Sequence, residues 1–380
     1  MTANLTSNIW KLTNFLENTN SKFNKEEILS NLPEGLIDDA IKSISTWENY
    51  SPTPLVKLNK LNDQLKFKNI YYKDEDKRFD LKSFKALGGA FAVYKIASEK
   101  KNITVSTATA GNHGRSVAWG AQRLGLKCKI FISEFVSESR AEAMRKLDAE
   151  VIRVKGNYDN SLKECIKQSK ENNWEIVQDV SWEGYKAVPK LIMAGYTIMI
   201  KEILDEVKSN SISHVFLQAG VGGMAAAMIA GFAKLSQNIP KFIIVEPENA
   251  DCVFQSIKNN KPTSVDIKKE TVMGGMSCGD VSSIAWEILK NSSNYCLTIS
   301  DEAISTTVAL LAEKRLSNEK IIAGECAVPG IIALISSFNN KEYLDKLELN
   351  EQSNVLLFGC EGLTDSAMYQ KLLSDGLQKI

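Results

Sequence analysis

The 380-residue sequence has only two histidines, His113 and His214, and no two cysteines in a Cys-x-x-Cys spacing. It therefore has little material for a histidine-based catalytic triad or for a zinc site, and we expect no bound metal. His214, at the start of an expected strand, is interpreted as a structural residue. The seven cysteines are scattered and odd in number, which is typical of reduced thiols in a cytosolic protein. This pattern predicts a cytoplasmic location.

The sequence also lacks net charge, because Lys plus Arg and Asp plus Glu are both 46. Without an excess of either sign, no overall field favours a nucleic acid or an anionic membrane surface. The longest apolar runs, such as residues 224–230, fall far below the roughly 20 residues that span a bilayer. The N-terminus has no apolar stretch of signal-peptide length. We therefore expect neither nucleic acid nor membrane as a partner, but a small molecule.

From about residue 50 onward, short β-branched runs alternate with amphipathic helical patterns. The expected elements begin with a strand at Asn69–Lys73, a helix at Phe84–Lys100, a strand at Ile103–Thr107, a helix at His113–Leu124 and a strand at Lys127–Ile132. Such alternation is typical of βαβ units, so the fold class is α/β with a largely parallel sheet covered by helices. The polar residues 1–50 predict two short helices, near Lys25–Asn31 and Leu36–Trp47, in a lead-in that packs on the body.

A glycine-rich turn, residues 220–223 with the sequence Gly-Val-Gly-Gly, follows the strand at residues 214–218 and opens a helix near Met224. Glycines at this place let backbone N–H groups converge on an anion, which predicts a phosphate site. A plain strand-to-helix turn is the structural alternative. A dinucleotide site is a second alternative: Ala225 stands where a third glycine is expected, but Glu246 ends the next strand.

Two further segments contain residues that can take part in catalysis or ligand binding. Lys85 lies at an expected helix start, and it can act as a Schiff-base nucleophile if it lies near the glycine turn with a depressed pKa. Residues 107–114, Thr-Ala-Thr-Ala-Gly-Asn-His-Gly, can cap a helix or offer several N–H groups to a carboxylate. A phosphate loop, a carboxylate loop and a lysine together fit an amino acid that meets a phosphorylated aldehyde cofactor.

In this order, the motifs resemble those of the fold-type-II pyridoxal-phosphate enzymes, the tryptophan synthase β and threonine dehydratase superfamily. Within it, the sequence is most similar to the diaminopropionate ammonia-lyase family. The resemblance covers about residues 50–365, and its carriers are residues 72–75, 78–79, 83–89, 111–115, 178–179, 182–185, 218–223, 273–276, 324–325 and 361–365. It implies two open, twisted, mostly parallel α/β domains with the cofactor in the cleft between them.

The resemblance also implies domain boundaries and an assembly. The large cofactor-binding domain is expected to comprise residues 1–98, including the lead-in, and residues 197–380. The small domain is expected to span residues 99–196. Family members are commonly homodimers, so a homodimer is expected by resemblance alone.

Roles for individual residues follow from the resemblance. Lys85 would hold pyridoxal 5′-phosphate as a Schiff base, with Phe84 beside it, and Asn112 would hydrogen-bond the 3′-oxygen. Cys360 falls where the family places a neutral group against the ring nitrogen, which favours elimination over transamination. The cofactor phosphate would be bound by the backbone of Gly220, Val221, Gly222, Gly223 and Met224. The substrate would be bound by Thr109, Ala110, Gly111 and His113.

The implied reaction is α,β-elimination from a small amino acid, most simply 2,3-diaminopropionate, to give pyruvate and ammonia. Lys85 would act as the base at Cα, and Asp179 would assist departure of the β-amino group. One departure from the family is Ala110, where the lyases usually have an aspartate associated with the D-isomer. We therefore expect a preference for the L-isomer. A serine/threonine-type dehydratase and a non-catalytic homologue that binds the cofactor are the alternatives.

Overall fold

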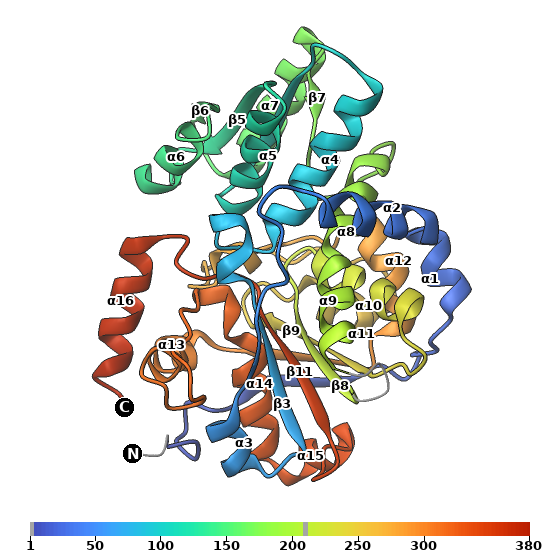
Figure 1. The fold of residues 1–380 in the computed structure, drawn as a ribbon. Helices are drawn as coiled ribbons and strands as arrows, with labels where there is room; N and C mark the ends of the chain where they lie inside the picture. The colour runs from blue at the N-terminus through green and yellow to red at the C-terminus, as the bar shows by residue number, and fades with distance from the viewer. Residues whose placement is uncertain (1–3, 208–211) are drawn as a thin grey trace.

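The computed structural model describes residues 4–207 and 212–380, and its strands form two sheets (Figure 1). The larger has the order β1-β10-β9-β8-β11-β3-β2. Its inner pairs are parallel, whereas the edge strands β1 and β2 are antiparallel to their neighbours. The strands are β1 (Leu12–Glu17), β2 (Leu55–Lys57), β3 (Asn69–Asp74), β8 (His214–Gln218), β9 (Lys241–Pro247), β10 (Tyr295–Ile299) and β11 (Asn354–Gly359).

The smaller sheet has the order β6-β5-β4-β7 and is parallel throughout. Figure 1 shows it above the larger sheet, with α5, α6 and α7 around it. Its strands are β4 (Thr104–Ala108), β5 (Lys127–Ser133), β6 (Glu150–Val154) and β7 (Glu175–Ile176). Two mostly parallel sheets with helical connections confirm the predicted α/β class.

The helices cover the sheets and connect consecutive strands. The helices of the N-terminal half are α1 (Lys25–Asn31), α2 (Glu34–Ser45), α3 (Asn59–Leu65), η1 (Glu75–Asp80), α4 (Lys85–Glu99), α5 (Asn112–Arg123), α6 (Glu138–Arg145), α7 (Tyr158–Asn172), α8 (Ala187–Tyr196) and α9 (Ile198–Glu206). Those that follow are α10 (Gly223–Leu235), α11 (Cys252–Asn259), η2 (Gly274–Met276), α12 (Ser283–Ser292), η3 (Asp301–Ala303), α13 (Ile304–Ala312), η4 (Glu325–Ala327), α14 (Pro329–Phe338), α15 (Lys341–Leu347) and α16 (Ser366–Leu377). Within residues 4–207 and 212–380, no helix combines the length and apolar character needed to cross a membrane.

The centre of the large sheet positions the chemistry. Every residue of β8 and of β11 is buried, because both strands have sheet neighbours on each side and helices over the faces. Since β3, β8 and β11 run parallel, their carboxyl ends meet at one edge of the sheet. Ligands in open α/β sheets bind outside this edge.

The N-terminal segment, described from residue 4, is only partly as expected. The two helices predicted there are confirmed as α1 and α2. The strand β1 was not predicted, because its sequence, Leu-Thr-Asn-Phe-Leu-Glu, has no period-2 alternation. It forms through tertiary pairing with β10, where the hydroxyls of Thr13 and Thr298 lie 2.7 Å apart. The boundaries at residues 98/99 and 196/197 stay a prediction, and we note that α4 packs against α5.

Candidate active site

Lys85 is the first residue of α4, and a tightly wound loop sets its position. Phe79, Asp80 and Lys82 have φ angles of 49°, 58° and 59°, in the left-handed region that residues with a side chain rarely adopt. At the end of this loop, the N–H of Phe84 donates to the carbonyl of Cys360 at 3.1 Å. Lys85 is thereby fixed beside the carboxyl end of β11.

The Lys85 ammonium pairs with a carboxylate from a distant segment. Its Nζ lies 2.5 Å from Oδ2 of Asp179, with the two side chains 25% and 14% exposed. The same oxygen lies 3.7 Å from Nδ1 of His113. Burial alone would raise the pKa of Asp179, but the charge of the Lys85 ammonium and its hydrogen bond hold it well below its usual range. Asp179 is therefore a carboxylate.

The condition of a depressed Lys85 pKa is not met in this state of the protein. Burial does lower the pKa of Lys85, but the charge of Asp179 and the hydrogen bond to it outweigh burial and raise the pKa above its ordinary value. Lys85 is thus held as an ammonium by its partner. It can become a nucleophile only when it gives up this proton or when another cation takes its place at the carboxylate.

The segment that contains Asp179 is held in place on both sides. The Gln178 amide bridges to β4, donating to the Ala108 carbonyl at 2.9 Å and accepting from the Ala108 N–H at 3.0 Å. The Tyr185 hydroxyl accepts from the Gln178 N–H at 2.9 Å, and its ring stacks on Trp182 with 4.2 Å between ring centroids. Asp179 is therefore presented on a braced turn.

The glycine turn after β8 forms an uncapped helix N-terminus. Gly222 has a φ of 86°, and a Cβ there would lie 2.8 Å from Cδ1 of Leu289, so both the conformation and the space require glycine. Among the residues that the structure describes, no side chain caps α10, although the first N–H groups of a helix have no partner within it. A Cβ on Gly223 would meet only the Asp179 carbonyl, at 3.9 Å. The first N–H groups of α10 are therefore available to an anion next to Asp179.

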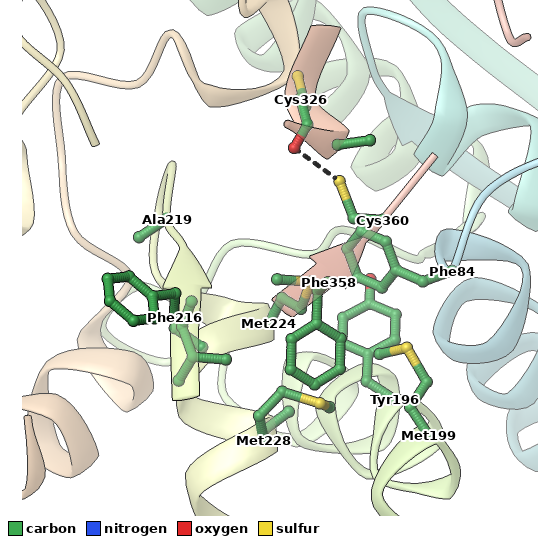
Figure 2. Packing of buried hydrophobic residues seen from close by; sticks show 14 of the residues in the cluster. Phe84, Tyr196, Met199, Phe216, Ala219, Met224, Met228, Cys326, Phe358 and Cys360 are labelled. Atoms are coloured by element: carbon green, nitrogen blue, oxygen red, sulfur yellow. Dashed lines mark hydrogen bonds between the residues drawn. The ribbon is translucent and has the colours of Figure 1, made fainter. Parts of the chain in front are cut away.

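Cys360 directly follows β11 and is a neutral thiol. Burial, foremost, and the charge of Glu361 raise its pKa well above the usual value. Figure 2 shows its sulfur directed at the carbonyl of Cys326, to which it donates at 3.1 Å. Gln218, the last residue of β8, donates to the same carbonyl at 3.0 Å. These bonds connect the carboxyl ends of β8 and β11.

The loop before α5 folds on its own threonine. The Thr109 hydroxyl accepts from the N–H groups of Gly111 at 3.0 Å and Gly114 at 3.2 Å. Asn112 donates to a Glu361 carboxylate oxygen at 2.6 Å, which places it one residue from Cys360. The carbonyl of Ala110 accepts from Arg140 at 3.3 Å. A substrate role for Thr109, Ala110 and Gly111 stays a prediction.

An acidic cluster beside this loop was not among the predicted site residues. Glu325 and Glu361 are both buried, and Arg140 faces Glu325 at 3.4 Å and Asp365 at 3.1 Å. Burial and the charge of Glu361 raise the pKa of Glu325 to about 8. Potential ligand atoms of Glu325, Cys326 and Glu361 lie within 4.8 Å of one another. The available signal was the position of Glu361, two residues after the end of a buried strand.

The structure thus brings the predicted residues to one edge of the large sheet. Asp179 contacts both Lys85 and His113. The backbone of Phe84 is hydrogen-bonded to that of Cys360, and Asn112 is hydrogen-bonded to the next residue, Glu361. The glycine turn, with Val221 and the buried Met224, lies beside Asp179. His214 lies apart, at the other end of β8, where its Nε2 bonds the Leu347 carbonyl at 2.8 Å.

Comparison with known proteins agrees with this geometry. The family described as pyridoxal-phosphate dependent enzyme matches residues 46–361. Diaminopropionate ammonia-lyase of Escherichia coli K12 is 33% identical over 352 residues, which cover 86% of this chain and 88% of that protein. The enzyme of the same name from Salmonella typhimurium is also 33% identical, over 86% and 89% of the two chains.

Solved structures match over nearly the whole length. The E. coli diaminopropionate ammonia-lyase in complex with D-serine aligns with a TM-score of 0.90 and 30% identity, covering 97% of this chain and 98% of that one. The same enzyme in complex with an aminoacrylate-PLP azomethine reaction intermediate aligns with a TM-score of 0.89. Threonine deaminase isoform 2 of Solanum lycopersicum, 20% identical with a TM-score of 0.79, shares the fold.

Proposed function

We propose a reaction for this chain on one premise: it belongs to the family of pyridoxal-phosphate dependent enzymes, and within them to fold type II. The reaction is α,β-elimination of ammonia from 2,3-diaminopropionate, with the L-isomer preferred, to give pyruvate and ammonia. Relatives that cover most of the chain carry the name diaminopropionate ammonia-lyase, which supports this substrate.

The residues present fit pyridoxal 5′-phosphate. The uncapped N-terminus of α10, with a positive φ at Gly222 and open space at Gly223, suits a phosphate dianion. Lys85 would form a Schiff base with the cofactor's aldehyde. Asn112 would hydrogen-bond the cofactor's 3′-oxygen in place of its present partner, Glu361. The neutral thiol of Cys360 would face the ring nitrogen without protonating it. When bound, the cofactor withdraws electrons from the substrate's Cα and so acidifies its proton.

The chain's own residues then carry out the proton transfer and the elimination. Lys85, once replaced by the substrate's α-amino group, is a free amine at the Cα proton and takes it as a general base. The electron pair left at Cα forms a double bond to Cβ while the Cβ–N bond breaks and its pair goes to the nitrogen. Because that nitrogen starts as an ammonium, it leaves as neutral ammonia. Hydrolysis of the remaining three-carbon enamine gives pyruvate and a second ammonia.

One observation carries this choice of substrate: a carboxylate with only 14% of its side chain exposed, that of Asp179, already holds an ammonium at 2.5 Å within the site. In the absence of substrate, that ammonium belongs to Lys85. A substrate whose β-substituent is an ammonium can take the same place after Lys85 has joined the cofactor. A β-hydroxyl has no charge to offer this carboxylate, so the pairing favours a diamine over serine.

The test is product stoichiometry with the purified, cofactor-loaded protein. L-2,3-Diaminopropionate should give two ammonia for each pyruvate, the D-isomer should react more slowly, and L-serine should react poorly. Equal rates for the two enantiomers would contradict the L-preference. Faster turnover of L-serine than of the diamine would contradict the substrate itself.

Ala110 is the specific observation that favours a second candidate, a serine/threonine-type dehydratase. Its side chain cannot supply the second base associated with the lyases. Partial relatives named L-threonine dehydratase support this candidate, the first being 30% identical over 58% of the chain. The stoichiometry decides between the two, because serine releases one ammonia for each pyruvate. The expected homodimer, cytoplasmic location and absence of a metal stay predictions.

A further inference from the structure

Of the two ring nitrogens of His113, only Nε2 has a hydrogen-bond partner among the described residues. Nε2 lies 2.7 Å from the carbonyl oxygen of Val177. A carbonyl oxygen can only accept, so Nε2 carries the hydrogen and Nδ1 of the neutral ring has a bare lone pair. Within the part of the chain that the structure describes, this Nδ1 is buried and makes no hydrogen bond. Burial, the largest influence, lowers the pKa of His113 and keeps the ring neutral.

The bare nitrogen faces the carboxylate of the site. Nδ1 of His113 and Oδ2 of Asp179 are 3.7 Å apart, and both are acceptors. Two hydrogen-bond acceptors that face each other cannot bond each other. Their arrangement is favourable only when a donor group lies between them and donates a hydrogen to each. In this structure the Lys85 ammonium donates to the Asp179 carboxylate at 2.5 Å, and among the described residues Nδ1 of His113 has no donor.

The other titratable groups around this pair are neutral. Tyr158, from α7, has its pKa raised by burial and by the charge of Asp179. Cys278, which precedes α12, has its pKa raised to about 12 by burial and by the same charge. The charges that face His113 are therefore the Lys85 ammonium and the Asp179 carboxylate.

We propose that Nδ1 of His113 and the carboxylate of Asp179 together form the subsite for the substrate's β-ammonium group. This inference rests on the proposed function and adds its specificity-determining residue. After Lys85 has joined the cofactor, the β-ammonium donates one hydrogen to Asp179 and another to His113. The nitrogen stays fully protonated until the Cβ–N bond breaks, when it takes the bonding pair and departs as ammonia. A β-hydroxyl has a single hydrogen and leaves one acceptor unserved, so the pair discriminates against serine.

His113→Gln tests the subsite, because glutamine can keep the bond to Val177 while it removes the acceptor at Nδ1. His214→Gln is the matched control: His214 is also buried and also bonds a backbone carbonyl through Nε2, at 2.8 Å, but far from the site. We expect His113→Gln to lower kcat/KM for L-2,3-diaminopropionate by about 10- to 100-fold, the range for losing a hydrogen bond to a charged group.

A neutral isostere separates recognition of the ammonium from general damage. L-2-Aminobutyrate has a methyl group in place of the β-ammonium, and its inhibition constant against the diamine should change by less than about threefold in His113→Gln. If the inhibition constant of L-2-aminobutyrate rises by the same factor as kcat/KM for the diamine falls, the subsite is refuted and His113 has a structural role. A wild-type enzyme that does not eliminate ammonia from the diamine would instead refute the proposed function.

Nitrogen NMR of the imidazole rings gives a readout that does not depend on turnover. The chain has only two histidines, so His214→Gln assigns both rings. In the substrate-free protein, we expect His113 to be neutral at pH 7 with its hydrogen on Nε2. A hydrogen on Nδ1, or a charged ring at pH 7, would overturn the proposal, because the nitrogen could then not accept from an ammonium.

Discussion

Asp179→Asn removes one charge from the site and keeps the shape of the side chain. In the wild type, its carboxylate oxygen lies 2.5 Å from the Lys85 ammonium. With substrate bound, the β-ammonium is expected to occupy this place. Asparagine can still accept one hydrogen bond, so the substitution isolates the contribution of charge.

The magnitude follows from Coulomb attraction with partial screening. Two unit charges 4 Å apart attract by about 4 kcal/mol at an effective dielectric constant near 20. The side chains of Lys85 and Asp179 are 25% and 14% exposed, so water weakens the attraction at this place. We therefore use about half of the full Coulomb energy, about 2 kcal/mol. Because 1.4 kcal/mol corresponds to a factor of ten, kcat/KM for the diamine should fall about 30-fold.

The assay follows pyruvate from L-2,3-diaminopropionate through a coupled reduction, at equal cofactor loading of variant and wild type. Glu175→Gln is the matched control, because it also removes a carboxylate that pairs with a lysine, Lys100 at 2.6 Å, but at a pair whose side chains are 54% (Lys100) and 29% (Glu175) exposed. That variant should keep the wild-type rate. A loss of less than about threefold in Asp179→Asn would refute the view that its charge holds the β-ammonium.

Three further substitutions test other parts of the site. Gly222→Ala should lower the melting temperature and weaken cofactor binding in equilibrium dialysis, because alanine costs about 1–2 kcal/mol at a positive φ and its Cβ meets Leu289. Ala110→Asp should raise the ratio of D- to L-isomer turnover by about tenfold, a gain limited because nearby Arg140 lowers the basicity of the new carboxylate. Glu325→Gln should change how the melting temperature depends on pH. With its pKa raised from 4.5 to about 8, the folded protein keeps a proton that the unfolded chain has already lost, so this group makes stability fall as pH rises from 4.5 to 8. The variant should therefore be more stable relative to wild type at pH 8 than at pH 5.

The first two substitutions have matched control variants, and the third has a contradicting outcome. Gly35→Ala, at a helix position where a Cβ meets nothing within 4 Å, should leave cofactor binding unchanged. Ala110→Asn has the size of aspartate without its basicity and should leave the enantiomer ratio unchanged. A melting-temperature difference between Glu325→Gln and wild type that is the same at both pH values would contradict the raised pKa.

The sequence predicted the central sheets better than the edges. β-Branched runs such as residues 243–245 of β9 form strands where they are buried on both faces, so local pattern and tertiary structure agree there. β1 has no such pattern and exists because β10 offers it a free edge. Only the folded arrangement of the sheet reveals that edge.

The candidate site shows the same division. Motifs with a local mechanism, such as the glycine turn at Gly222, were recognisable from the sequence because the turn itself needs those residues. The raised pKa of Lys85 was not predictable, because its partner Asp179 lies 94 residues away in the chain. The bare nitrogen of His113 depends on a bond to a backbone carbonyl, which a sequence motif does not encode.

The central claim is that this site eliminates ammonia from a diamine, and the most direct measurement counts the products. Purified, cofactor-loaded protein is given L-2,3-diaminopropionate, and pyruvate and ammonia are measured in the same sample. The account predicts sustained turnover with two ammonia for each pyruvate. No pyruvate from the diamine, together with rapid formation of one ammonia for each pyruvate from L-serine, would contradict it.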